Sequence, residues 1–174
     1  MNVSTSIIPF DPIEAGAGTV AWLRAVGISV PTRAGRAPLL EEVLDALRTF
    51  PGVPIECDPP VPPARDFCIR FGDAAGPNGG VRLEGMLDEG RSITLWIHGA
   101  RDEWMMLAIV KRLSQRCGPQ LVFTDAAHAD DFSIVTPETE IEAESARRRE
   151  RWNAARPDGP PARVIRPLPP FSDA

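Results

Sequence analysis

The sequence has few cysteines, and their arrangement excludes two common uses of this residue. Cys57, Cys68 and Cys117 are widely spaced and form no CxxC pair. An odd number of widely spaced cysteines is not a disulfide framework, and without paired cysteines a cysteine-rich zinc site is not expected. We therefore expect three reduced thiols, as in a cytoplasmic protein.

Membrane and secretion signals are also missing. The chain contains no run of about 18 apolar residues, the length that a membrane-spanning helix needs. Its first residues, MNVSTSIIPFDPIEAG, show no basic region followed by an apolar run, so they do not have the pattern of a secretory signal. These absences predict a cytoplasmic protein that has no membrane as a partner.

Basic residues are too few for a typical nucleic-acid-binding protein. The 174-residue chain has 24 acidic and 19 basic residues, which gives a formal charge of −5, and its only lysine is Lys111. Nucleic-acid-binding domains usually carry a surplus of basic residues, so we expect no nucleic acid as a partner. The content of hydrophobic residues, 43%, is typical of a folded globular domain.

The composition changes near residue 137. Residues 137–174 hold seven prolines, seven acidic residues and seven arginines, so this segment is neutral and the charge of −5 belongs to residues 1–136. We predict one α+β domain over residues 1–136. Residues 137–174 are predicted to be a charged, proline-rich tail, helical at Glu138–Ala155 or disordered.

Three helices are predicted in the domain from capping residues and apolar spacing. The first begins at Pro12, with Asp11 as its N-cap, or only at Thr19, since Gly16 and Gly18 weaken the first turns, and it ends before Gly27. The second covers Pro38–Thr49. The third covers Asp102–Cys117, where apolar residues recur at intervals of three and four.

Five strands are predicted from alternating apolar and polar residues. They are Asp66–Phe71, Val81–Leu87, Ser92–His98, Gln120–Thr124 and Phe132–Val135. The first three should form an antiparallel meander, and Val53–Glu56 is a short extended piece. The predicted fold is therefore α+β, in the order α-α-β-β-β-α-β-β. It has a mainly antiparallel sheet of about five strands packed on helices in two or three layers.

The meander has one apolar face and one mixed face. The apolar residues, which we expect to pack on the 102–117 helix, are Phe67, Ile69, Phe71, Val81, Leu83, Ile93, Leu95 and Ile97. The mixed face carries Cys68, Arg70, Arg82, Glu84, Met86, Thr94, Trp96 and His98. Arginine, tryptophan and methionine are enriched in protein interfaces. Either the N-terminal helices cover the mixed face, or it is an open binding surface.

His98 is a candidate for chemistry because it ends a predicted strand just before a glycine. Cys68 or Glu84 would lie near it on the same face, where a nucleophile or an acid–base pair could form. The alternative is a histidine that only bonds to its neighbours. No GxSxG motif occurs in the chain, and we assign no catalytic residue.

The second histidine lies in an acidic loop, Asp125-Ala-Ala-His-Ala-Asp-Asp131. Asp125, His128, Asp130 and Asp131 are of the residue types that bind divalent cations, but their spacing matches no metal-binding motif. A solvated loop or an acidic contact patch is the simpler interpretation. The glycine-rich residues 72–80 lead into a strand and contain no lysine, so they are not a phosphate loop. We expect no metal and no cofactor.

The order of elements around residues 67–136 carries a resemblance. A helix is followed by Gly118-Pro-Gln-Leu-Val-Phe-Thr-Asp125, an acidic loop and the closing Asp131-Phe-Ser-Ile-Val135. In a small acidic α+β chain without a catalytic signature, this order resembles the immunity proteins of bacterial polymorphic and contact-dependent toxin systems. The resemblance implies a non-catalytic cytoplasmic protein that binds and neutralises a toxin domain encoded by a neighbouring gene.

The resemblance transfers no functional residues, so the expected contacts come from the chain itself. The expected partner-binding residues are Arg70, Arg82, Glu84, Trp96, His98, Asp125, His128, Asp130 and Asp131. Two alternatives stay open. One is a small enzyme that uses His98 with Cys68 or Glu84. The other is an adaptor or assembly protein that acts through its tail, where Pro167-Leu-Pro-Pro-Phe171 could dock in an aromatic groove.

Overall fold

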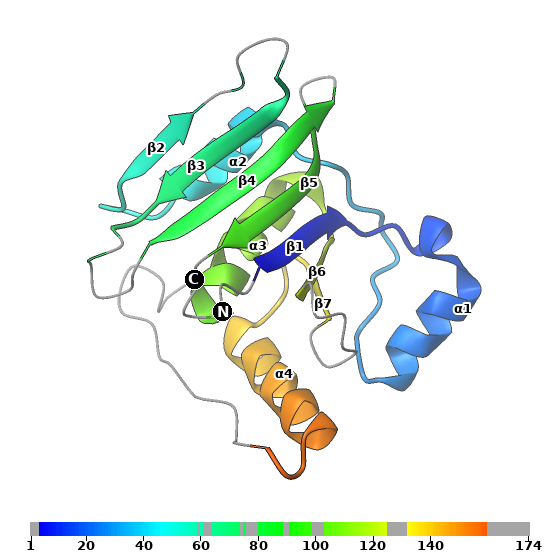
Figure 1. The fold of residues 1–174 in the computed structure, drawn as a ribbon. Coiled ribbons are helices and arrows are strands. Elements are labelled where there is room, and N and C mark those ends of the chain that lie inside the picture. The colour runs from blue at the N-terminus through cyan, green and yellow to red at the C-terminus, as the bar shows by residue number, and fades with distance from the viewer. Residues whose placement is uncertain are drawn as a thin grey trace.

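A computed structural model describes residues 4–58, 60, 64–73, 75, 80–88, 91–98, 103–124 and 132–159, with only the backbone described at 91–94 (Figure 1). The helices are α1 (Pro12–Ala25), α2 (Leu40–Arg48), α3 (Glu103–Cys117) and α4 (Ile141–Ala155). The strands are β1 (Ser4–Pro9), β2 (Ile55–Asp58), β3 (Asp66–Phe71), β4 (Val81–Asp88), β5 (Arg91–His98), β6 (Gln120–Thr124) and β7 (Ser133–Val135). None of the described helices has the length and apolar content to cross a membrane.

The described strands form one antiparallel sheet of seven strands in the order β2-β3-β4-β5-β1-β6-β7. The α+β class and the β3–β4–β5 meander are confirmed. The prediction of about five strands was wrong. β1 was not predicted at all, and β2 was expected only as a short extended piece that ended before Asp58.

β1 occupies the middle of the sheet, between β5 and β6. Its Ile7 pairs with Leu95 on one side and with Val122 on the other. Thr5 and Ser6 are buried although both are polar. These small hydroxyl residues remove the apolar alternation from which strands are recognised, so local sequence gives no signal for a central strand.

The main core lies on one face of the sheet, under α2 and α3. Ile69, Leu83 and Ile97 are fully buried there and belong to the same apolar cluster as Leu107 and Leu113 of α3. Figure 1 shows α2 and α3 behind the sheet. The predicted packing of the meander on the third helix is therefore confirmed, except for Ile93, whose side chain lies outside the described residues.

α1 lies on the opposite face, and only at the β6–β7 end. Leu23 packs there in a second apolar cluster with Phe10, Ile28 and Ile134. The predicted N-cap is present, since Asp11 Oδ1 accepts a hydrogen bond of 2.7 Å from the Ile13 amide. The two N-terminal helices thus pack on different faces of the sheet. No described helix covers the outer side of β2–β5.

The segment between α1 and α2 is held against the turn that links α3 to β6. The Gly35 amide donates to the Phe10 carbonyl at 2.7 Å, and the Arg36 amide donates to the Cys117 carbonyl at 2.8 Å. A Cβ atom added at Gly35 would lie 1.9 Å from the Pro119 carbonyl oxygen. Only glycine allows the two backbones to approach so closely.

We expect Gly35→Ala to lower the free energy of unfolding by about 1–3 kcal/mol, because the methyl group forces two backbone segments apart. Gly18→Ala is the matched control. An added Cβ at Gly18 meets no atom within 4 Å, and alanine favours the helix, so this variant should be neutral or slightly more stable. Urea unfolding measures both. An unchanged midpoint for Gly35→Ala would contradict the described contact.

The start of α2 is fixed by an ion pair with this same segment. Arg36 donates to both carboxylate oxygens of Glu42, at 2.7 and 2.5 Å, and Glu42 also accepts from the Leu39 amide at 2.9 Å. The bond from Arg36 is the main cause that lowers the pKa of Glu42 from an ordinary 4.5 to about 2. A lowered folded-state pKa stabilises the protein above the unfolded-state pKa, and this stability is lost as pH falls through the folded-state pKa.

We therefore expect the gap in unfolding free energy between wild type and Glu42→Gln to be about 1–3 kcal/mol above pH 5. This gap should close as the pH falls from 4.5 toward 2. Glu41→Gln is the control, because the Glu41 side chain is 68% exposed and its ion pair with Arg48 is screened by water and should contribute little stability. Chemical denaturation across this pH range makes the measurement. An equal difference in unfolding free energy at pH 6 and at pH 2.5 would contradict a stabilising ion pair between Arg36 and Glu42.

Candidate functional site

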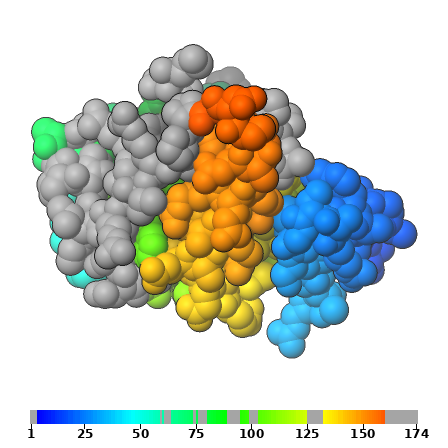
Figure 2. Space-filling model, turned by 90° about the horizontal axis from the view of Figure 1, so that it is seen from below, coloured from blue at the N-terminus to red at the C-terminus, as the bar shows by residue number. Residues whose placement is uncertain are grey.

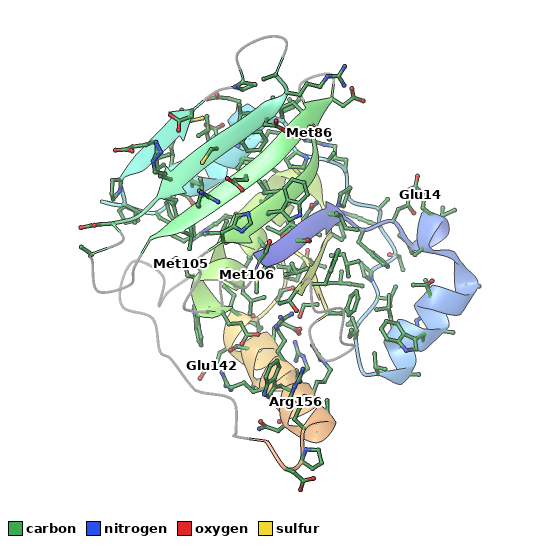
Figure 3. All side chains as sticks on the ribbon, viewed as in Figure 1. Glu14, Met86, Met105, Met106, Glu142 and Arg156 are labelled. Carbon is green, nitrogen blue, oxygen red and sulfur yellow. The ribbon has the colours of Figure 1, made fainter. Side chains whose placement is uncertain are left out.

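The outer side of β2–β5, which we call the open face, carries most of the exposed polar side chains of the sheet. Its described members are Glu56, Asp58, Asp66, Cys68, Arg70, Arg82, Glu84, Met86, Trp96 and His98. Figure 3 looks onto this face and labels Met86, which is 40% exposed. Strand register brings these residues together, because alternate residues of each strand point to the same side.

Two rows of side chains cross the open face. In the first row, Asp58 lies opposite Cys68, Cys68 opposite Glu84, and Glu84 opposite Trp96. In the second row, Glu56 lies opposite Arg70, Arg70 opposite Arg82, and Arg82 opposite His98. The acidic residues of one row therefore stand beside the basic residues of the other.

Glu84 joins the two rows. Its Oε1 lies 3.0 Å from Arg82 Nε, and its Oε2 lies 3.0 Å from His98 Nε2. Arg70 makes a second connection, at 2.9 Å to Asp58 Oδ2 and 3.4 Å to Glu56 Oε2. Exposed ion pairs of this kind add little stability, but together they hold the long side chains in defined positions.

A shallow groove of about 370 Å³ lies along the first row. Asp58, Asp66, Glu84 and Trp96 line it together with Phe67, Cys68 and Gly85. Cys68 is the smallest side chain of this row, which accounts for the depression between Asp58 and Trp96. The groove thus combines three carboxylates with one side of an indole ring.

The open face offers an acid–base pair but a poor nucleophile. His98 and Glu84 are within hydrogen-bond reach of each other, as an enzyme would require. Burial raises the pKa of the Cys68 thiol, and the negative charge of Glu84 raises it further. Cys57 also has a raised pKa, mainly through burial, and its partner across the strands is the inward-facing Ile69. Within the described part of the chain, no group of three or more His, Cys, Asp and Glu residues could hold a metal ion.

The five expected contact residues of the meander lie together on the open face: Arg70, Arg82, Glu84, Trp96 and His98. The other four, Asp125, His128, Asp130 and Asp131, lie outside the described residues. Sequence reasoning missed Glu56 and Asp58, because β2 is short and stands between prolines. It also gave no role to Asp66, although that residue begins a correctly predicted strand.

No protein-family model matches the sequence, no curated protein matches it, and no solved structure matches the fold. The resemblance to bacterial immunity proteins therefore stays an expectation from sequence. What the open face can bind has to be argued from its own residues.

The raised pKa of Cys68 can be tested by alkylation. We expect Cys68 to react with iodoacetamide at pH 7.5 more slowly than in the urea-unfolded chain, because the thiolate is the reacting form. Glu84→Gln should shift the rate–pH profile of Cys68 to lower pH. Mass spectrometry of the Cys68 peptide follows the reaction. A profile that already reaches its plateau at pH 7 would instead identify an activated nucleophile.

Proposed function

We propose that this chain is a non-catalytic protein-binding domain that docks a protein partner on its open face. We further propose that it is an immunity protein, whose partner is a toxin domain encoded by a neighbouring gene. The observation that carries the proposal is the open face itself. No described helix covers it, and the ion-paired Asp58 and Glu84 line a groove on it together with Trp96.

The side chains of the open face are suited to an interface. Tryptophan and arginine contribute the largest share of binding energy in many protein complexes. Arg70 and Arg82 are already held by carboxylates in the free protein, at 2.9 and 3.0 Å. Less side-chain entropy is then lost when a partner binds, which favours affinity.

The charge of the open face favours a basic partner. Four carboxylates, of Glu56, Asp58, Asp66 and Glu84, stand against two arginines. Asp66 forms no ion pair with any residue that the structure describes, and it borders the groove together with Trp96. An arginine or lysine of the partner would meet carboxylates and an aromatic ring there, and both attract cations.

The acidic charge of the open face also agrees with neutralisation of a toxin. Many toxins that act on nucleic acid are basic, and an acidic partner associates with them faster through electrostatic steering. A rapid, specific partner would protect the cell by covering the toxin's active site. The −5 charge of the whole chain would also attract a basic toxin.

The test is growth rescue. Cells that produce the protein encoded by an adjacent gene should stop growing, and co-expression of this chain should restore growth. Asp66→Lys should weaken binding to the purified toxin domain at least tenfold, because it reverses a charge at the groove. Glu14→Lys makes the same change on α1, on a side chain outside the open face, and should alter the dissociation constant less than twofold.

Two results would contradict the proposal in different ways. If no protein encoded by an adjacent gene is toxic and bound by this chain, the role in immunity is wrong. If a toxin is bound but Asp66→Lys and Glu14→Lys behave alike, the open face is not the binding surface.

The 3.0 Å contact between His98 and Glu84 supports a second candidate, a small enzyme that inactivates its target. Glu84→Gln keeps the shape of the side chain but removes its basicity. An enzyme would lose growth rescue in this variant while still binding its target. A binding protein would keep rescue in proportion to the affinity that remains.

A further inference from the structure

α4 docks on the body of the protein through an unusual set of residues. Its buried residues are Ile141, Glu144, Ser145 and Arg148, which lie on one face at the spacing i, i+3, i+4 and i+7. In most surface helices this stripe is apolar. Here Ile141 is its only apolar member, and it lies at the first turn.

Arg148 connects α4 to two other elements. Its side chain is 7% exposed and forms an ion pair with Glu103, the first residue of α3. It also donates to Ser133 Oγ of β7 at 2.9 Å. Ser145 adds a third bond, from its hydroxyl to Glu103 at 3.2 Å.

Glu144 extends the same network. Its side chain is 10% exposed and accepts a bond of 2.5 Å from Ser133 Oγ. Arg147 and Arg151 of α4 lie 2.8 and 3.2 Å from its carboxylate. Arg151 also donates to the Phe132 carbonyl at 2.9 Å. The helix is therefore held by charge and hydrogen bonds over most of its buried length.

Such a contact is easier to open than an apolar one. When a polar interface separates, water solvates the groups that were paired, whereas an apolar interface exposes surface that water disfavours. Replacing buried ion pairs with apolar residues is often neutral or stabilising, so these pairs fix the orientation of α4 more than they strengthen its attachment.

α4 also has a free flank. A cleft of about 570 Å³, lined by Ile28 and Pro31 opposite Glu140 and Ala143, separates it from the segment after α1 (Figure 2).

We propose that α4 is a detachable arm. It leaves α3 and β7 as one unit while the sheet, α2 and α3 stay folded. Release exposes Ser133, the covered part of Glu103 and the part of the core that Ile141 closes. A partner that binds the released state would shift the population toward it. The arm is independent of the open face and of the partner proposed there.

Native-state hydrogen exchange of the full chain tests this. We expect the amides of residues 145–148 to exchange at least about a hundredfold faster than those of residues 107–113 in α3, because release of the arm precedes global unfolding. Trypsin provides a second measurement. It should cut after Arg147, Arg148, Arg149 or Arg151 while Lys111, Arg112 and Arg116 in the same molecules stay intact. Equal exchange rates in the two helices would overturn the proposal.

Two double variants identify the cause. Glu103→Leu with Arg148→Met replaces the partly buried ion pair by apolar contact and should slow exchange in α4 at least about tenfold, with no change in α3. Glu41→Leu with Arg48→Met removes the exposed 2.6 Å pair of α2 and should leave exchange in α4 unchanged within twofold. If α4 exchange is unchanged or faster in the first variant, polar docking is not what makes the arm detachable. If that variant fails to fold, the wild-type comparison still decides whether the arm exists.

Discussion

Backbone pairing of β1 with β5 on one side and β6 on the other makes a single sheet from two separate groups of strands. Without it, the β2–β5 group and the β6–β7 pair would share no ladder. The same pairing determines where the following residues go. Phe10 and α1 continue from the end of β1 onto the outer side of β6–β7, whereas α2 returns to the inner side beside α3. One half of the outer side is therefore covered and the other half, over β2–β5, has no described helix on it.

The binding proposal depends on this unequal coverage. An open sheet face made of apolar residues would promote aggregation, and this one has its arginines and carboxylates in mutual contact instead. A partner must replace some of these contacts or fit around them. The fixed positions of these charges select strongly between partners with matching and mismatched charges. The raised pKa of Cys68 lowers the fraction of thiolate in the groove.

Much of the fold was predictable where side chains alternate or recur along a continuous segment. α3, β3 and β6 were predicted to within one residue at each end, and the alternation in β3–β5 also placed Arg70, Glu84 and Trp96 on one face. β1 was missed because its position depends on pairing with distant strands and because its first three residues, Ser4, Thr5 and Ser6, are small and polar. The docking of α4 was missed for a related reason. A helix was one of the two predictions for Glu138–Ala155. Its buried stripe consists of Glu144, Ser145 and Arg148 after Ile141, and apolar periodicity does not show that a helix packs through ion pairs.

The central position of β1 also affects how the protein is made. β1 leaves the ribosome before either of its neighbours, and its partners in β5 and β6 are residues 95–98 and 120–124. For most of synthesis, Ile7 and Ile8 thus have no strand to pair with, and the sheet cannot close until α3 and β6 have emerged. Pairings between residues so distant in sequence form slowly, because a long loop must close first. The nascent chain should therefore depend on chaperones more than its small size would indicate.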